Sequence, residues 1–312
     1  MNPIERVRAL DSQIFVERYV VPGRPVIVTD AMEGWPARRL WNPAYLSEKI
    51  GDIEVQVYDD LFGLKNVMPL ADYFTDYFGQ ARDAHATNYV RGYSRLKSLD
   101  FYWADEAFSR LAPDWGTPAF MPRGGYLIPD EPLHAESSLA PYRGLFISGR
   151  GCRTRLHRDP WTTSAMLCQF HGTKRIEMYA PDQAAHLMDG DEFVDISNPD
   201  RKRFPNFDHA RIHHQDTLVP GEILFIPGGW LHHVTTLTDS ISVTWNFLHE
   251  SGRASLCRFL AENPDDPELD VIKFFLRKQV REDASAAEII AALETGAPGG
   301  VKATGRMTAQ AS

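Results

Sequence analysis

Short apolar runs, often alternating with polar residues, dominate residues 143–250, and glycine or proline stands in most of the turns between them. Alternation with a period of two places one face of a strand in a core. Several short strands at near-regular spacing are typical of a sandwich or barrel. The pattern predicts strands at residues 144–148, 163–170, 174–179, 216–219, 223–226, 233–237 and 240–247, and a short helix at residues 181–188.

The region before residue 143 mixes helical and strand patterns. We expect helices at residues 1–20, 42–51 and 69–78, and strands at residues 26–28 and 53–58. The second of these helices has the clearest ends, because Asn42 can cap it, Pro43 suits its first position and Gly51 closes it. Residues 79–142 are rich in aromatic residues and show no clean period. There we expect one or two strands, a helix near residues 105–111, and long loops that border a site.

From residue 251 the apolar spacing becomes helical. Helices are expected at residues 255–262, 267–277 and 285–293. The last begins with Ser285 and has Glu288 three residues later, which is the pattern of a capping box. We therefore predict one domain at residues 1–250 with its barrel mainly at 143–250, a helical extension at 251–295, and a flexible tail at 296–312.

The composition narrows the classes of function that fit this pattern. The chain has 312 residues, 43% apolar and 24% charged, as in a globular protein with a substantial core. Its net charge of −9 argues against general electrostatic binding of nucleic acid. Three widely spaced cysteines argue against a disulfide scaffold or a structural zinc site. Because no apolar stretch approaches the roughly 18 residues of a membrane helix and no signal core is seen, we expect a cytoplasmic protein without a membrane span.

Two segments carry candidate metal ligands. His157 and Asp159 are separated by one residue, so in an extended segment their side chains share a face and can bind one ion. Far downstream, His232 and His233 follow an apolar run and a glycine-rich turn, which would bring a third ligand to the mouth of a barrel. Two histidines and one carboxylate form the facial triad of non-haem Fe(II) oxygenases. Surface or packing histidines are the alternative for each segment alone, and physics does not separate His232 from His233.

Five blocks of sequence, in the same order, resemble the JmjC or cupin-like Fe(II)- and 2-oxoglutarate-dependent oxygenases over roughly residues 12–250. The blocks are residues 23–28 with 34–37, 154–160, 172–175, 220–234 and 242–247. The resemblance implies a mainly β protein with a double-stranded β-helix, a jelly-roll or cupin-like barrel, flanked by N-terminal and C-terminal helices. It also implies Fe(II), 2-oxoglutarate as co-substrate and molecular oxygen.

Carried over residue by residue, the resemblance makes His157, Asp159 and His232 the iron ligands. It selects His232 because the family places this ligand two residues before a small apolar residue, here Val234. Lys174 matches the basic residue that pairs with the far carboxylate of 2-oxoglutarate. A buried lysine without an anion is costly, so Lys174 in an apolar strand fits a dianion, although alone it would be read as a solvated turn residue.

Four further residues match the co-substrate pocket by resemblance. Thr154 matches a hydroxyl that hydrogen-bonds the far carboxylate, and Tyr89 is a candidate for a phenol that reaches the co-substrate. Thr244 and Asn246 share a strand face and match residues that line the pocket.

Leu167 departs from the family pattern, because several relatives have an asparagine at this place. We therefore expect the pocket beside the metal to be less polar than in those relatives. Gln169 lies on the same face of the predicted strand, and we expect it to compensate in part.

Other features allow two interpretations. A group of arginines around the metal segment predicts either an electropositive mouth or an ordinary solvated loop: Arg143, Arg150, Arg153, Arg155 and Arg158. The pair His213 and His214 predicts surface residues rather than a second metal site. Cys168 is expected to be a small core residue. The C-terminal helices are expected to pack on the barrel, and they could also form a homodimer.

The favoured hypothesis is an Fe(II)- and 2-oxoglutarate-dependent oxygenase that hydroxylates an amino-acid side chain in a protein or peptide, or a small metabolite. One alternative is a cupin-like binding or scaffold protein with a degenerate pocket, supported only by Leu167. Another is a different cupin metalloenzyme, such as an isomerase, which would not need Lys174, Thr154 and Asn246 together. The sequence leaves open the substrate and the choice between hydroxylation and demethylation.

Overall fold

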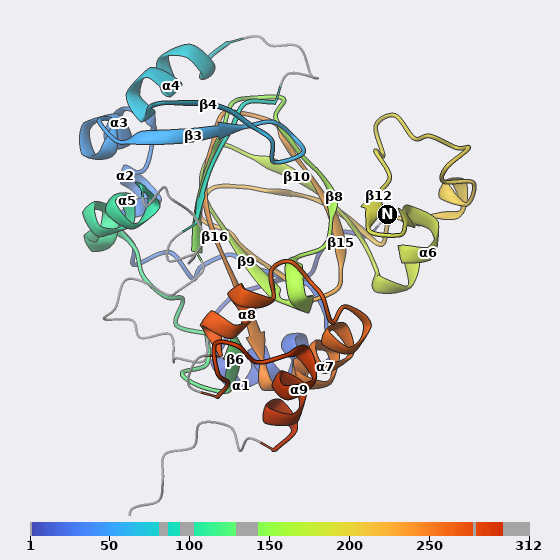
Figure 1. The fold of residues 1–312 in the computed structure, drawn as a ribbon. Helices are drawn as coiled ribbons and strands as arrows, with labels where there is room; N and C mark the ends of the chain where they lie inside the picture. The colour runs from blue at the N-terminus through green and yellow to red at the C-terminus, as the bar shows by residue number, and fades with distance from the viewer. Residues whose placement is uncertain (1, 81–86, 94–102, 129–142, 277–278, 296–312) are drawn as a thin grey trace, which may run out of the picture.

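Two mainly antiparallel β-sheets dominate the computed structural model, which describes residues 2–80, 87–93, 103–128, 143–276 and 279–295 (Figure 1). The larger sheet has the strand order β1-β2-β14-β9-β16-β7-β5-β3-β4, with β6 also paired to β16. Its strands are β1 Arg6–Val7, β2 Val26–Val28, β3 Glu54–Tyr58, β4 Leu64–Pro69, β5 Tyr89–Tyr93, β6 Tyr126–Ile128, β7 Arg143–Ser148, β9 Ser164–His171, β14 Ile223–Ile226 and β16 Ser240–His249. The smaller sheet has the order β13-β10-β15-β8. Its strands are β8 Arg153–His157, β10 Lys174–Tyr179, β13 His214–Leu218 and β15 Leu231–Thr236.

The inner faces of the two sheets pack against each other. Leu167 and Leu224 of the larger sheet share a buried apolar cluster with Ile176 and Val234 of the smaller sheet. Strand β9 is buried on both faces, because its alternate residues Met166 and Cys168 belong to the outer core instead. Cys168 is therefore a small core residue, as predicted. The strand-rich, helix-flanked architecture confirms the predicted mainly β fold class and is compatible with a jelly-roll.

Helices cover the outer face of the larger sheet. They are α1 Ser12–Phe15, the π-helix Val16–Val20, α2 Ala37–Leu40, α3 Pro43–Ile50, α4 Leu70–Tyr77, α5 Trp103–Leu111 and the 3-10 turn Ala112–Asp114. Helix α3 begins as predicted, because the Asn42 side chain accepts a hydrogen bond from the Tyr45 amide. Helix α5 and strands β5 and β6 confirm the expected elements of residues 79–142, whose remaining stretches 81–86, 94–102 and 129–142 lie outside the described residues.

An insertion between β10 and β13 covers the outer face of the smaller sheet. It contains the turn Pro181–Gln183, helix α6 Ala184–Leu187, the hairpin of β11 Met188–Asp189 and β12 Glu192–Phe193, and the turn Phe207–His209. Leu187 and Val194 of the insertion pack on Leu156 and Tyr179 of the sheet. The helix expected at residues 181–188 is thus present as a 3-10 turn followed by one short α-helix.

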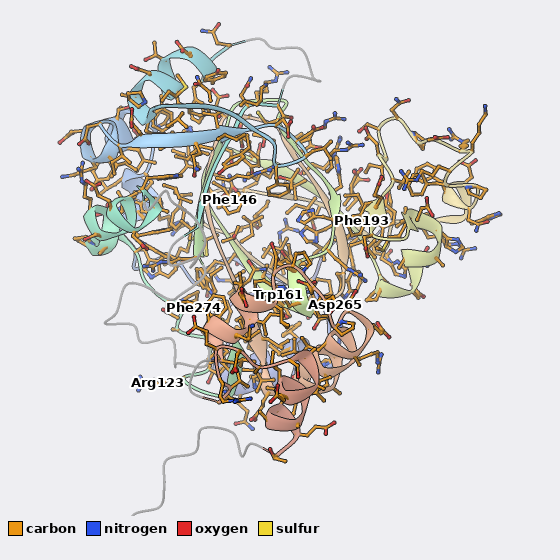
Figure 2. The ribbon with its side chains drawn as sticks, in the orientation of Figure 1. Arg123, Phe146, Trp161, Phe193, Asp265 and Phe274 are labelled. Carbon is orange, nitrogen blue, oxygen red and sulfur yellow. The ribbon has the colours of Figure 1, made fainter. Side chains whose placement is uncertain are left out.

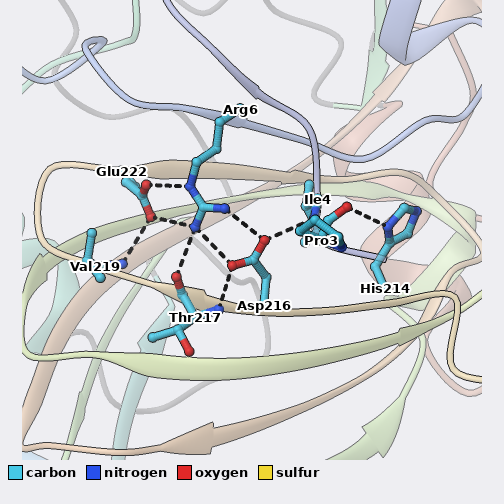
Figure 3. A network of polar contacts seen from close by, with 8 residues as sticks. All are labelled: Pro3, Ile4, Arg6, His214, Asp216, Thr217, Val219 and Glu222. Carbon is cyan, nitrogen blue, oxygen red and sulfur yellow. Dashed lines mark hydrogen bonds and ion pairs between the residues drawn. The ribbon is translucent and has the colours of Figure 1, made fainter. Parts of the chain in front are cut away.

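The prediction of a helix over residues 1–20 was wrong for its first half. Residues 6 and 7 form β1, which pairs in parallel with β2, and α1 begins only at Ser12. The reason is tertiary: the Arg6 guanidinium donates hydrogen bonds to Asp216 at 2.8 Å and to Glu222 at 2.9 Å (Figure 3). Both carboxylates are far from Arg6 in sequence, so a local pattern of residues does not reveal them. They hold the segment extended at the edge of the sheet.

Two strands had no clear signal in the sequence. Strand β8 is polar at four of its five positions, and only Thr154 and Leu156 are buried. Strand β4 forms an edge of the larger sheet and is mostly exposed. Neither strand has the regular apolar alternation by which a strand is recognised.

The C-terminal helices, α7 Arg253–Glu262, α8 Leu269–Phe275 and α9 Ala286–Thr295, form an apolar cluster of their own, preceded by the turn Glu250–Gly252. The cluster also contains Leu248 of β16 and Trp161, which lies close to the candidate ligands. The predicted capping box is present, because the Glu288 carboxylate accepts from the Ser285 amide and the Ser285 hydroxyl accepts from the Glu288 amide. The homodimer stays a prediction, and residues 296–312 lie outside the described residues. None of the helices in the described ranges combines the length and apolarity required to cross a membrane.

The Arg6 network predicts a pH-dependent contribution to stability. Replacing Arg6 with Met should lower the free energy of unfolding at neutral pH by about 1–2 kcal/mol, because two partly buried carboxylates lose their cation. Burial raises the pKa of Asp216, but the hydrogen bonds from Arg6 and from the amides of Ile4 and Thr217, together with the charge of Arg6, outweigh burial and leave that pKa lowered. A lowered pKa stabilises the fold above the ordinary aspartate pKa of about 4, and this stabilisation disappears as the pH falls further.

Urea unfolding of both proteins between pH 3 and pH 7 measures the difference. The gap between wild type and Arg6→Met should be widest near pH 7 and should narrow below about pH 4. Arg8→Met is the matched control, because Arg8 is exposed and pairs with the exposed Glu33. An equal effect of the two substitutions would contradict the role given to Arg6.

Candidate metal centre

Three metal-binding side chains meet at the end of the smaller sheet. Ligand atoms of His157, Asp159 and His232 all lie within 4.8 Å of one another, and among the described residues no other group of this kind is found. His157 ends β8 and pairs directly with His232 of β15, so the two imidazole rings have centroids 4.1 Å apart. Asp159 is separated from His157 by one residue and lies on the same side, as the spacing predicted.

The backbone fixes which nitrogen of each histidine is available. The Nδ1 atom of His157 lies 2.8 Å from the carbonyl oxygen of Arg155, and that of His232 lies 3.1 Å from the carbonyl oxygen of Trp230. A carbonyl only accepts, so each Nδ1 carries the hydrogen and each Nε2 keeps its lone pair. This arrangement orients metal-binding imidazoles in many proteins.

The surroundings change the pKa values of two of these groups. Desolvation and the nearby His232 hold the pKa of His157 well below its ordinary value, so the ring stays neutral at physiological pH. Desolvation raises the pKa of Asp159, although His232 and a hydrogen bond from Asn246 oppose this effect. Two imidazoles and one carboxylate are a donor set that suits a divalent transition metal and leaves one face open.

Strand alternation separates His232 from His233. His232 points inward with Val234, whereas His233 points outward with Thr235 and lines a different, outer pocket. Both side chains are buried. Burial, Arg153 and Arg175 lower the pKa of His233 to about 4, so it is a neutral packing residue. The structure thus brings His232, and not His233, to His157 and Asp159.

All of the predicted site residues line one cavity between the two sheets. Lys174 is 1% exposed, and its ammonium group donates to the Tyr89 hydroxyl at 2.9 Å and to the Ser242 hydroxyl at 2.7 Å. Burial raises the pKa of Tyr89, but the charges of Lys174 and Arg91 outweigh burial and leave that pKa lowered. The cavity therefore has the candidate metal centre on one side and a cationic, hydroxyl-rich end on the other.

Sequence reasoning missed three residues of this site. Ser242 stands beside Lys174, and Arg91 donates to the Thr154 hydroxyl at 3.2 Å. Phe62, in the turn between β3 and β4, lines the cavity and lies edge-on to His157. Ser242 begins a block that had been singled out, so its position could have been found, but Arg91 and Phe62 lie in stretches without a motif.

The wall opposite the ligands is partly apolar. Leu167, Thr244 and Asn246 line the cavity, as does Phe146, which Figure 2 labels inside the barrel. The expected compensation by Gln169 was wrong. The amide group of Gln169 donates to the carbonyl oxygens of His171 and Gly172 and to the Ser240 hydroxyl, and the residue does not reach the cavity. Leu167 thus adds an apolar surface to the cavity wall, beside Thr244 of the neighbouring strand.

The arginine cluster does not form one electropositive mouth. Arg143 is buried against the rings of Phe108 and Trp115 in the outer core. Arg153 pairs with Asp60, and Arg155 pairs with Asp195. The cluster is dispersed because Arg143 lies in β7, whereas Arg153 and Arg155 lie in β8 and pair with different carboxylates. His213 and His214 lie beside the Trp230 ring, with ring centroids 5.9 Å and 5.6 Å from its centroid.

A separate groove of about 810 Å³ leads away from the candidate metal centre. Asp159 lines both the cavity and the groove, so the two spaces meet at this ligand. Trp161 and Phe193, both labelled in Figure 2, stand on the groove walls, and α7 contributes Arg258 and Glu262.

The turn after Asp159 has an unusual backbone. Trp161 and Thr162 have φ values of 53° and 60°, in the left-handed region that glycine favours. The Trp161 ring is buried among the C-terminal helices, with its centroid 6.4 Å from that of Phe275. Two consecutive strained residues persist only where the surrounding packing holds them, so the helices fix the turn that carries Asp159.

Comparison with known proteins gives one family match and several related proteins. Residues 11–253 match the family described as "Cupin-like domain". The chain is 26% identical over 272 residues to lysine-specific demethylase JMJ21 of Arabidopsis thaliana, covering 83% of this chain and 26% of the relative. It is 28% identical over 257 residues to tRNA wybutosine-synthesizing protein 5 of Danio rerio, covering 77% and 73%. It is 24% identical over 276 residues to 2-oxoglutarate and iron-dependent oxygenase JMJD4 of Gallus gallus, covering 83% and 63%.

Adjacent histidines in β15 give a matched test of the candidate ligands. His232→Ala should weaken binding of a divalent metal by about 100-fold or more, because groups that only orient ligands already account for about 10–100-fold. His233→Ala should leave the metal content close to that of the wild type, since this ring faces the outer pocket. Metal analysis after anaerobic loading with Fe(II) and dialysis measures both. Loss of metal in His233→Ala with retention in His232→Ala would contradict the assignment.

Proposed function

The chain belongs to the cupin-like domain family, and on this premise we propose that it is an Fe(II)- and 2-oxoglutarate-dependent oxygenase. The observation that carries the proposal is one cavity with two different ends. The His157, Asp159 and His232 group stands at one end, and the buried Lys174 stands at the other. A metal and a dianion that chelates it are the pair of ligands that these two ends suit. The chain spans only 26% of the first relative named above and 63% of JMJD4, so activity and substrate both belong to this proposal.

The residues of the chain fit each group. In the proposed complex His157, Asp159 and His232 hold iron on one face, with both Nε2 lone pairs directed by backbone carbonyls. When bound, iron supplies the redox chemistry by which this class of enzyme uses oxygen and 2-oxoglutarate to oxidise a C–H bond, with release of succinate and CO2. Lys174, Tyr89 and Thr154 hold the far carboxylate of 2-oxoglutarate, while Thr244 and Asn246 line its side.

Burial makes the clamp effective. The Lys174 ammonium group contacts two hydroxyl groups and, among the described residues, no carboxylate. The full charge of Lys174 therefore remains available to a bound anion. The apolar side chains Leu167, Ile226 and Val234 exclude water from the cavity wall. A charge pair in such surroundings is screened less than at the surface, which strengthens the grip on the dianion.

We further propose that the reaction is hydroxylation of an amino-acid side chain in a protein or peptide, or of a small metabolite. The groove beside Asp159 supports a substrate with an extended chain, since apolar residues such as Phe193 and Phe259 alternate there with charged ones. One relative is named for lysine-specific demethylation and another for tRNA, so family membership alone does not choose the substrate. The net charge of −9 favours the protein, peptide or metabolite over nucleic acid.

Leu167 supports a second candidate function, a cupin-like binding protein without catalysis. Its side chain is 5% exposed and removes polarity from the cavity wall. The intact set of three candidate metal ligands and the buried Lys174 argue against this function, because a binding protein has no need of both.

The proposal predicts succinate formation that depends on the metal ligands. Protein reconstituted anaerobically with Fe(II) should convert 2-oxoglutarate to succinate when screened against peptides and free amino acids, and mass spectrometry should find a product with one added oxygen. His157→Ala and Asp159→Ala should reduce succinate to the level without protein, since each removes a metal ligand. His209→Ala, an exposed histidine in the insertion, is the control and should keep full activity. Wild-type protein that binds no iron, or forms no succinate, would contradict the proposal.

Lys174 predicts a different kinetic defect. Lys174→Met keeps the apolar stem but removes the charge, so the KM for 2-oxoglutarate should rise by about 10–100-fold with a smaller change in kcat. The exposed Lys202 supplies the control substitution Lys202→Met. Steady-state succinate assays at varied 2-oxoglutarate measure both constants. A fall in kcat at unchanged KM would show that Lys174 does not bind the co-substrate.

A further inference from the structure

Arg91 is a buried cation that the proposed function has not yet used. It lies in β5, is 3% exposed, and comes from the strand that also supplies Tyr89. Its guanidinium carbon lies 3.8 Å from the centre of the Phe62 ring and 4.3 Å from the centre of the Tyr89 ring. Two aromatic rings on one guanidinium group restrict its orientation strongly.

The polar contacts of Arg91 point in two directions. One terminal nitrogen donates to the Thr154 hydroxyl at 3.2 Å, and the other donates to the carbonyl oxygen of Asp59 at 3.5 Å. Asp59 begins the turn that carries Phe62, and its carboxylate accepts from the amides of Leu61 and Gly63 at 2.8 Å each. Arg91 therefore connects this turn to the wall of the co-substrate cavity.

The contact with Thr154 determines how that hydroxyl can act. A guanidinium group only donates, so the Thr154 oxygen accepts from Arg91 and must direct its own hydrogen elsewhere. Within the described part of the chain that hydrogen has no acceptor, and Thr154 lines the cavity that also contains Lys174. The hydroxyl hydrogen is thus free to point into the cavity, and the charge on Arg91 makes it a stronger donor.

We propose that Arg91 is a positioning residue for the co-substrate: it holds Thr154 so that the hydroxyl donates to the far carboxylate of 2-oxoglutarate. This inference rests on the proposed function. Arg91 acts through Thr154 and is not itself among the residues that line the cavity. It adds a second positive charge behind the hydroxyl groups that surround Lys174, and it keeps the Tyr89 ring in place from one side.

The inference predicts different effects on the binding of two 2-oxo acids of equal chain length. 2-Oxopentanoate has the five-carbon chain of 2-oxoglutarate but a methyl group in place of the far carboxylate. If Arg91 serves the far carboxylate, its replacement weakens binding of 2-oxoglutarate and leaves binding of 2-oxopentanoate unchanged. If Arg91 only supports the fold around Phe62, both acids lose affinity together.

The experiment measures binding of each acid by calorimetry to full-length protein loaded with Mn(II) without oxygen, so that no turnover occurs. Arg91→Met and Thr154→Val should each weaken 2-oxoglutarate binding by about tenfold or more, and the double variant should bind no more weakly than Thr154→Val alone. Arg91→Lys should recover part of the affinity, because it keeps the charge but loses the fork. Binding of 2-oxopentanoate serves as the control that the fold and metal are intact.

Each of the other outcomes would refute either the role of Arg91 or the proposed function. Equal losses for both acids, or additive losses in the double variant, would refute the action of Arg91 through Thr154. Unchanged binding of both acids by Arg91→Met would do the same. Wild-type protein that does not bind 2-oxoglutarate at all would instead refute the proposed function, so the two failures can be told apart.

Discussion

The register of β15 against β8 is the constraint on which the candidate centre depends. In this register His232 stands directly across from His157, and their neighbour Asp159 completes the group. A slip of one residue would turn His232 outward and bring His233 inward, because side chains alternate along a strand. The register is held by apolar burial on the inner face, where Val234 packs with Ile176 of the neighbouring strand. Packing in the core therefore determines which histidine can reach the metal.

The Lys174 end of the cavity is also formed by both sheets. Lys174 opens β10 in the smaller sheet, whereas its partners Tyr89 and Ser242 come from the larger sheet. The cation is thus held by hydroxyl groups across the space between the sheets. Neutral partners satisfy its hydrogen bonds but leave its charge available, which is the condition a pocket for an anion must meet.

Motif and period predicted most of the barrel, the α3 cap and the residues that meet in the cavity, because these depend on local spacing or on blocks shared with a family. The failures have tertiary causes. The N-terminal segment has helical spacing, but the distant Asp216 and Glu222 hold Arg6 in a strand. Arg91 follows Tyr89 by two residues, yet its role depends on Thr154 and Phe62, which lie far away in sequence. Gln169 shares a strand face with Leu167 but is engaged by the following turn, which a period of two does not reveal.

The strained turn after Asp159 has a consequence for how the chain can be shortened. A chain that ends at residue 250 would keep all three candidate ligands and every residue that lines the cavity. It would nevertheless lose the helices that enclose Trp161, and the turn Pro160–Thr162 would be free to relax to ordinary backbone angles. Asp159 directly precedes that turn. The helical extension therefore packs on the turn next to the candidate centre, and a chain cut after the last strand should lose that support.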